Sequence, residues 1–168
     1  FAGLKKTVVE KSRVPLFLAD HGIDLEPDLF RVAPEVRNLR IMRSFDRIEI
    51  TPSAIDRDWC WLSIVYDDGN QQVSLADILR AKEKGQRFVS TESGWVDCEA
   101  SDFADIGAVA GRKRKTAIRK HGDRKVVRLS RADLLRFRAV EEKRLSIRGD
   151  AEKIEHLDRL LALKPATP

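Results

Sequence analysis

The sequence feature with the clearest chemical potential is a run of basic residues in the second half of the chain. Positions 111–148 hold 15 lysines and arginines against 4 acidic residues, whereas positions 1–110 hold 14 against 19. Positive side chains at this density can neutralise nucleic-acid phosphates without reading the base sequence. We therefore predict nucleic-acid contact by the densest part of the run: Arg112, Lys113, Arg114, Lys115, Arg119 and Lys120. An exposed linker, or a surface that docks on acidic parts of another protein, would have the same composition.

Other side chains in the sequence could extend such a contact. Five more basic residues follow the run: Arg128, Arg131, Arg136, Arg138 and Lys143. They fall on two flanks of the helix expected there, where long basic side chains often border a core, so they define no single groove. Trp59 and Trp61 share one face of an expected strand and could stack on the bases of a single strand. Large aromatic residues in an apolar strand more commonly pack in a core, and we predict that role for both.

The remaining residue types that carry chemistry lack the spacing that a reaction centre requires. Gly107 and Gly111 are separated by three residues, whereas a phosphate-binding loop has four and ends in Gly-Lys-Ser/Thr. The three histidines are scattered, and none is paired closely with another histidine or a cysteine, as in zinc sites. Asp56 and Asp58 resemble an acid–base pair, but they precede a strand, where aspartate commonly caps or turns. We predict no catalytic residue, no metal site and no cofactor in this chain.

The elements that must position these residues follow from hydrophobic periodicity and turn residues. Residues 58–66 favour a central strand, and 67–70 favour a tight turn. Ser74 favours the start of a helix that ends at Gly85. Further strands are expected within 29–50, interrupted by Pro34 and Pro52, and at 86–90, 94–98 and 125–129, with helices at 14–18, 101–111, from 130, and at about 151–163. This order indicates an α+β fold, with a mixed or mainly antiparallel sheet of short strands, packed helices and a helical C-terminal part.

Composition adds expectations about core and context. Phe88, Trp95 and Val96 are core candidates in the expected hairpin, and Val109 and Val140 in the helices that follow it. The only two cysteines form no CxxC motif, which fits a reducing compartment. No stretch approaches the roughly 18 to 20 apolar residues of a membrane span. Because the sequence starts without methionine, we expect it to be an internal piece of a longer polypeptide.

Five short motifs occur in the order found in one known family: VPLFL at 14–18, DWCWL at 58–62, QVSLADIL at 72–79, GQRFV at 85–89 and SG at 93–94. In this order they make residues 14–145 similar to the helicase-associated domain that precedes the motor in bacterial Swi/Snf-type proteins of helicase superfamily two. Cys60 departs from the pattern, because relatives commonly have phenylalanine there. The resemblance suggests an α+β core at 1–110, a basic loop or linker at 111–124, and a strand with helices at 125–168 that completes the domain or leads to the motor.

What the resemblance implies about function is mostly context. The family's motifs for ATP hydrolysis lie in the motor, so no catalytic residue carries over, and ATP and magnesium would bind the motor of the parent helicase or translocase. This module would contact double-stranded DNA, brace the motor or regulate it, in a bacterial cytoplasm near the nucleoid, with no membrane or small-molecule partner. A protein-docking or autoinhibitory module without DNA binding is the alternative. A stand-alone enzyme such as a nuclease would need converging carboxylates.

Overall fold

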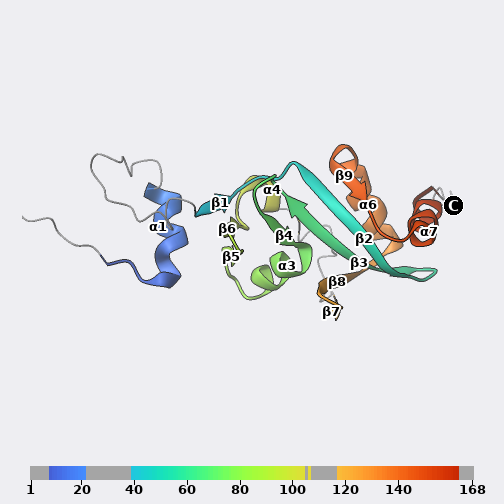
Figure 1. The fold of residues 1–168 in the computed structure, drawn as a ribbon, viewed down its shortest axis with the longest axis horizontal. Coiled ribbons are helices and arrows are strands. Elements are labelled where there is room, and N and C mark those ends of the chain that lie inside the picture. The colour runs from blue at the N-terminus through green and yellow to red at the C-terminus, as the bar shows by residue number, and fades with distance from the viewer. Residues whose placement is uncertain (1–7, 22–38, 105, 107–116, 163–168) are drawn as a thin grey trace, which may run out of the picture.

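The computed structural model describes residues 8–21, 39–104, 106 and 117–162, whose helices and strands form the predicted α+β fold (Figure 1). Helix α1 (Val14–His21), which follows the 3-10 turn η1 (Lys11–Arg13), lies at one end of the molecule. Helix α7 (Ala151–Ala162) lies at the opposite end. The strands between them belong to two sheets. Within the described parts of the chain, no helix is both long and apolar enough to cross a bilayer.

The larger sheet has six strands in the order β7-β8-β3-β2-β9, with β4 also paired to β3. Its members are β2 (Arg47–Ile55), β3 (Trp59–Asp67), β4 (Gln72–Ser74), β7 (Ile118–His121), β8 (Arg124–Ser130) and β9 (Leu145–Ile147). All neighbours are antiparallel except β2 and β9, which are parallel. Because β3 pairs with β2 along one edge and with β8 and β4 along the other, the central position predicted for this strand is confirmed.

The smaller sheet has three strands in the order β1-β6-β5: β1 (Arg40–Met42), β6 (Gly94–Asp97) and β5 (Phe88–Ser90). Strands β5 and β6 form the predicted hairpin, and β1 runs parallel to β6. The two backbones meet closely at Gly94, which has a φ of +153°. A Cβ added there would lie 2.0 Å from the carbonyl oxygen of Arg40, so the β1–β6 pairing requires glycine at this position.

The core lies on one face of the larger sheet and is covered by helices α3 (Leu75–Glu83), α6 (Arg131–Glu141) and α7. Residues from the sheet and from all three helices share one buried cluster, which includes Cys60, Leu62, Ile64, Tyr66, Ile78, Leu134, Phe137, Leu157 and Leu160. Half-buried and buried residues alternate from Trp59 to Leu62 of strand β3, because successive side chains of a strand point to opposite faces. Further along the strand, Ser63 and Asp67 are buried as well. The C-terminal helices are therefore part of the same core as β3.

The starts of two of these helices follow the predicted capping pattern. The hydroxyl of Ser74 accepts a hydrogen bond from the backbone N–H of Asp77 at 3.1 Å, and α3 begins at the next residue. The hydroxyl of Ser130 accepts one from the N–H of Asp133, also at 3.1 Å, immediately before α6. Each bond satisfies an N–H that has no partner within its helix.

The structure differs from the sequence predictions in several local features. Pro52 does not interrupt a strand but lies inside β2, where a bulge between Pro52 and Ala54 absorbs the irregularity. Val96 is buried as predicted, but Phe88 and Trp95 are only half-buried. Strand β7 lies within the stretch expected to be a loop or linker.

Some predictions fall on residues that the structure does not describe. Helix α4 (Ser101–Ala104) begins at the predicted residue, but positions 105 and 107–111 of the helix predicted there lie outside the described residues. Pro34 and Val109 lie outside the described residues, as does the side chain of Val140. The 3-10 turn η2 (Glu142–Arg144) joins α6 to β9.

Candidate nucleic-acid interface

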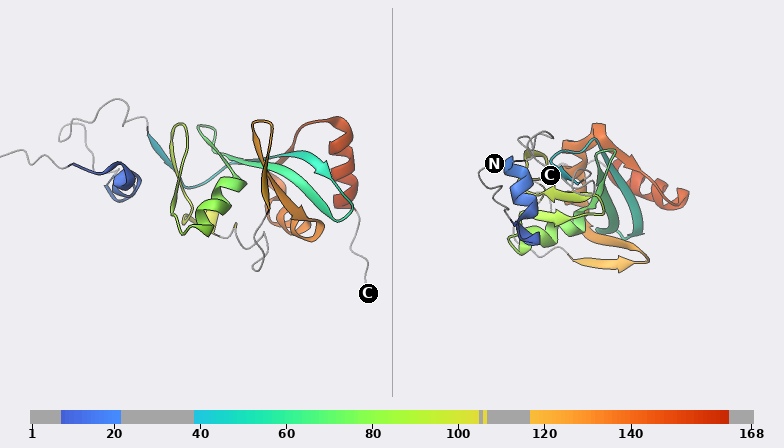
Figure 2. Two further views of the ribbon diagram at one scale, coloured as in Figure 1. Left: turned by 90° about the horizontal axis from the view of Figure 1, so that it is seen from below. Right: turned by 60° about the vertical axis from the view of Figure 1, so that its left-hand side comes forward.

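The basic part of the described chain forms a two-stranded hairpin, β7–β8, at the edge of the larger sheet (Figure 2). Gly122 and Asp123 make a two-residue turn between the paired residues His121 and Arg124. Gly122 has a φ of +61°, and glycine is preferred at the first position of such turns because it adopts positive φ without steric cost. The hairpin contains five lysines and arginines and one aspartate, so it is strongly positive.

Strand register determines which side chains of β3 and the hairpin share a face. Leu129 pairs with Cys60 and Val127 with Leu62, and all four point into the core. The intervening residues point to the opposite face, where Arg128 pairs with Trp61. Val126 is also on this opposite face, where it pairs with Arg119 of β7. It is only 1% exposed although it lies outside the core cluster.

On this face, each of two arginines lies over the ring of a tryptophan. The Cζ atom of Arg119 is 3.9 Å from the ring centroid of Trp61. That of Arg128 is 4.1 Å from the centroid of Trp59. Both tryptophans are half-buried and both arginines are exposed, so we call Arg119 and Arg128 the tryptophan-stacked arginines. The prediction that Trp59 and Trp61 pack in the core is wrong, because the helices cover the opposite face of β3.

The six predicted contact residues are only partly described. Arg112, Lys113, Arg114 and Lys115 lie outside the described residues. Arg119 and Lys120 are exposed neighbours on β7, and because successive residues of a strand alternate, they point to opposite faces of the hairpin. The two described residues of the predicted contact therefore lie on different faces.

Sequence reasoning missed the pairing of this basic strand with the tryptophan face. It treated Trp59 and Trp61 separately from the arginines, and it left Arg128 outside the predicted contact residues. The available signal was the period of two that places both tryptophans on one face of β3. Which strand lies beside β3 depends on tertiary pairing, and no local pattern around Arg119 predicts it.

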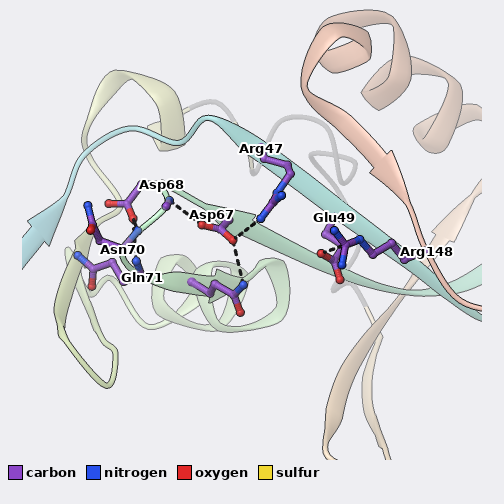
Figure 3. A network of polar contacts seen from close by, with 9 residues as sticks. Arg47, Glu49, Asp67, Asp68, Asn70, Gln71 and Arg148 are labelled. Carbon is purple, nitrogen blue, oxygen red and sulfur yellow. Dashed lines mark hydrogen bonds and ion pairs between the residues drawn. The ribbon is translucent and has the colours of Figure 1, made fainter.

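Elsewhere in the described residues, some arginines pair with a carboxylate of their own helix, and four others pair with carboxylates outside any shared helix; we call these four the carboxylate-paired arginines. Two are visible in Figure 3, where Arg47 binds Asp67 at 3.0 Å and Arg148 binds Glu49 at 3.4 Å. The others are Arg87, which binds Asp97 at 3.0 Å and Glu99 at 3.5 Å, and Arg144, which binds Asp102 at 3.4 Å. These ion pairs hold strands and turns of the fold together.

Two of the carboxylates involved have lowered pKa values. The amide of Gln72 donates a hydrogen bond that lowers the pKa of Asp67, and the N–H of Gly69 and the guanidinium of Arg47 lower it further, against the effect of burial. Burial alone would raise the pKa of Asp97. The hydrogen bonds from Arg87 and from the N–H of Glu99, with the positive charge of Arg87, outweigh it, so this pKa is also lowered. Both groups are therefore ionised at neutral pH.

The β7–β8 hairpin shows the opposite situation. Lys125 pairs with Asp77 of α3. No hydrogen bond or ion pair is recorded, within the described parts of the chain, for the side chains of Arg119, Lys120, Arg124 and Arg128. Their donors are available to an anionic partner, and the arrangement can bind phosphate groups electrostatically.

Both cysteines and the two aspartates of an open cleft are engaged in the core or in ion pairs. Burial raises the pKa of the Cys60 and Cys98 thiols to about 11, so both are neutral and enclosed at pH 7. An open cleft of about 800 Å³ includes Asp67 and Asp77, and these carboxylates bind Arg47 and Lys125 respectively. Among the described residues, no group of three histidine, cysteine or acidic side chains is placed to hold a metal ion.

No family model, curated protein or solved structure matches this chain. The similarity to the helicase-associated domain of Swi/Snf-type proteins therefore stays a prediction from the order of its sequence motifs. What the geometry defines is a class of surface: an exposed, positively charged sheet edge backed by two tryptophans.

Proposed function

We propose that this chain is a non-catalytic accessory domain of a bacterial Swi/Snf-type, ATP-dependent DNA helicase or translocase. In this proposal the domain contacts the backbone of double-stranded DNA through the β7–β8 hairpin and braces the motor. The order of the five sequence motifs supports the family, and the charge of the hairpin supports the DNA contact. ATP and magnesium would bind the motor, and the protein would act in the cytoplasm, at the nucleoid.

One observation carries the DNA contact. Four basic side chains of the hairpin are exposed and form no ion pair within the described residues, whereas the four carboxylate-paired arginines are held by acidic groups. A folded protein rarely gains stability from concentrating like charges on one edge, because they repel each other. Phosphate neutralisation offsets that repulsion and releases counterions from the nucleic acid.

The test is a titration of the 168-residue chain against a fluorescently labelled DNA duplex at several salt concentrations. We expect the logarithm of the binding constant to fall linearly with the logarithm of the salt concentration. The test variant is Lys120→Gln with Arg124→Gln. It should bind several-fold more weakly at low salt, with a slope reduced by about 2 because two phosphate contacts are lost.

A matched control removes the same charge from another surface. Arg80→Gln with Lys153→Gln neutralises two exposed residues on helices α3 and α7, and we expect its titration to equal that of the unmodified chain. A further variant that neutralises Arg112 to Lys115 tests the rest of the predicted contact. Absence of duplex binding at low salt would contradict the DNA contact and favour the docking or autoinhibitory alternative.

A further inference from the structure

The two tryptophan–arginine stacks have similar guanidinium-to-ring distances, 3.9 and 4.1 Å, although they come from different pairs of strands. Arg128 pairs with Trp61 across the ladder but lies over Trp59, its diagonal neighbour. Arg119 is one strand further away, beyond Val126, and reaches back to the ring of Trp61. Diagonal neighbours in a sheet are about 7–8 Å apart, within reach of long side chains. The result is a row of two guanidinium groups, each lying on an indole ring.

Stacking uses the face of a guanidinium group and leaves its edge free. An arginine carries five N–H donors in a planar fork, and all of them point outward around the rim of the plane. A ring under the face therefore restrains the side chain without occupying its donors. Within the described residues, no protein acceptor is recorded for the donors of Arg119 or Arg128.

Comparison with the other cation–ring contacts of the molecule separates this arrangement from ordinary packing. Arg87 lies 4.9 Å from the ring centroid of Phe88, and Arg144 lies 4.2 Å from that of Phe45. Each of these two arginines also binds a carboxylate, so its donors are used within the fold. Among the cation–ring contacts of the described residues, the two formed with tryptophan are different. Their guanidinium groups are stacked on a ring, and their N–H donors form no hydrogen bond or ion pair within the described chain.

A phosphodiester is the ligand that best fits the two stacked guanidinium groups. A planar fork of donors matches two oxygens of a phosphate, and a restrained side chain loses less conformational entropy on binding. Trp59 and Trp61 lie on the same face of β3, and same-face neighbours of a β-strand are about 7 Å apart. The guanidinium groups stacked on them can therefore contact neighbouring phosphates of one DNA strand. A base is a poorer fit, because a guanidinium already occupies the exposed face of each indole ring.

We propose that Trp59 and Trp61 are platforms that hold the guanidinium groups of Arg128 and Arg119 for contact with successive phosphates of a DNA duplex. The tryptophans position the arginines and do not stack on bases. This inference rests on the proposed function, and it adds that affinity depends on the planar, stacked group as well as on its charge.

The test compares charge-preserving variants in the duplex titration. Arg119→Lys with Arg128→Lys keeps both charges but removes the planar fork, and Trp59→Leu with Trp61→Leu removes the platforms. We expect both double variants to bind duplex DNA about fivefold more weakly or worse. Because the number of positive charges is unchanged, the salt dependence should keep the slope of the unmodified chain. Weaker binding with an unchanged slope would distinguish these variants from Lys120→Gln with Arg124→Gln, for which we expect a smaller slope.

Controls keep the test decisive. Arg13→Lys with Arg80→Lys makes the same exchange at two exposed arginines of η1 and α3 and should leave binding unchanged. Urea denaturation checks the fold of each variant, and the arginine-to-lysine pair decides the question if the tryptophan variant is unstable.

The outcomes distinguish the inference from the proposed function. Unchanged duplex affinity in Arg119→Lys with Arg128→Lys, while the unmodified chain binds, would overturn the platform and leave the DNA contact intact. No binding by the unmodified chain would overturn both. Tighter binding of single-stranded DNA, lost only when the tryptophans are removed, would show base stacking and also overturn the platform.

Discussion

The hairpins β5–β6 and β7–β8 carry the same type of contact with different consequences. In each, an arginine lies over an aromatic ring: Arg87 over Phe88 and Arg119 over Trp61. Arg87 also binds Asp97 and Glu99, whereas Arg119 has no recorded ion pair in the described chain. The first hairpin uses its arginine to hold the fold together, and the second keeps its arginine available at the surface.

The two hairpins also differ in the space around a glycine of each. A Cβ at Gly94 of β6 would collide with the backbone of β1, whereas a Cβ at Gly122, in the β7–β8 turn, would meet nothing within 4 Å. Strand β6 is thus closely approached by β1 at Gly94, and the tip of β7–β8 is open. We infer that substitutions in the first will act on stability and those in the second on binding.

The largest effect is expected for Gly94→Ala. The added methyl group overlaps the Arg40 carbonyl and the φ of +153° strains any other residue, so β1 must separate from β6. We expect a loss of about 3 kcal/mol or more in the free energy of unfolding, measured by urea denaturation. Gly122→Ala, strained only by its positive φ, should lose about 1–2 kcal/mol. Equal losses at the two positions would contradict the comparison.

The second-largest loss in the free energy of unfolding is expected for Asp97→Ala. Asp97 is 3% exposed and accepts hydrogen bonds from the side chain of Arg87 and the N–H of Glu99. Its removal should lower the free energy of unfolding by about 2–3 kcal/mol while DNA affinity of the folded protein stays unchanged. Glu99→Ala is the control, because this exposed partner should contribute less than about 1 kcal/mol.

We expect the stability of the fold to depend on pH through two carboxylates that bind the carboxylate-paired arginines, Asp67 and Asp97. Because folding lowers the pKa of Asp67 and Asp97, the unfolded chain binds more protons on these groups than the folded chain does. Their contribution to stability is complete above the ordinary value of 3.8 and is lost as the pH falls below it. Urea midpoints measured from pH 6 to pH 3 should fall, and Asp67→Asn should reduce the fall. A variant with an unchanged pH profile would disprove this assignment.

The smallest effect on stability is expected for Arg119→Ala. An exposed cation–π contact contributes about 0.5–1 kcal/mol, so the free energy of unfolding should change by no more than about that amount. Arg87→Ala should cost more, since it also breaks two ion pairs and leaves the buried carboxylate of Asp97 without its cation. If Arg119→Ala were the more destabilising of the two, the hairpin would be structural rather than a binding surface.

Local signals in the sequence were sufficient for most of the elements but insufficient for strand β7 and for the site. The caps at Ser74 and Ser130 were predictable, because a capping side chain needs only the backbone three residues ahead. Alternation along β3 showed that it has two faces, yet nothing local indicated that the one containing Cys60 would be the core. Packing by α3, α6 and α7 decided that, and so left Trp59 and Trp61 on the other side.

Strand β7 could not be predicted for a related reason. Ile118 is its only apolar residue, so it lacks the alternating pattern that identifies a strand. It is a strand because β8 offers it an edge, and such pairing depends on residues distant in the sequence.

The position of β9 bears on how this domain can be produced in the laboratory. Strand β9 closes the β2 edge of the larger sheet, the N–H of Arg148 donates to the carbonyl of Ile50 at 2.8 Å, and Leu157 and Leu160 of α7 enter the core. An expression clone that ends before β9 would leave the β2 edge of the sheet open, and one that ends between 148 and 156 would lack the apolar side chains of α7 that cover the core; both changes favour aggregation. Shorter clones designed around the sequence motifs alone would therefore be poor reagents for crystallisation or binding assays.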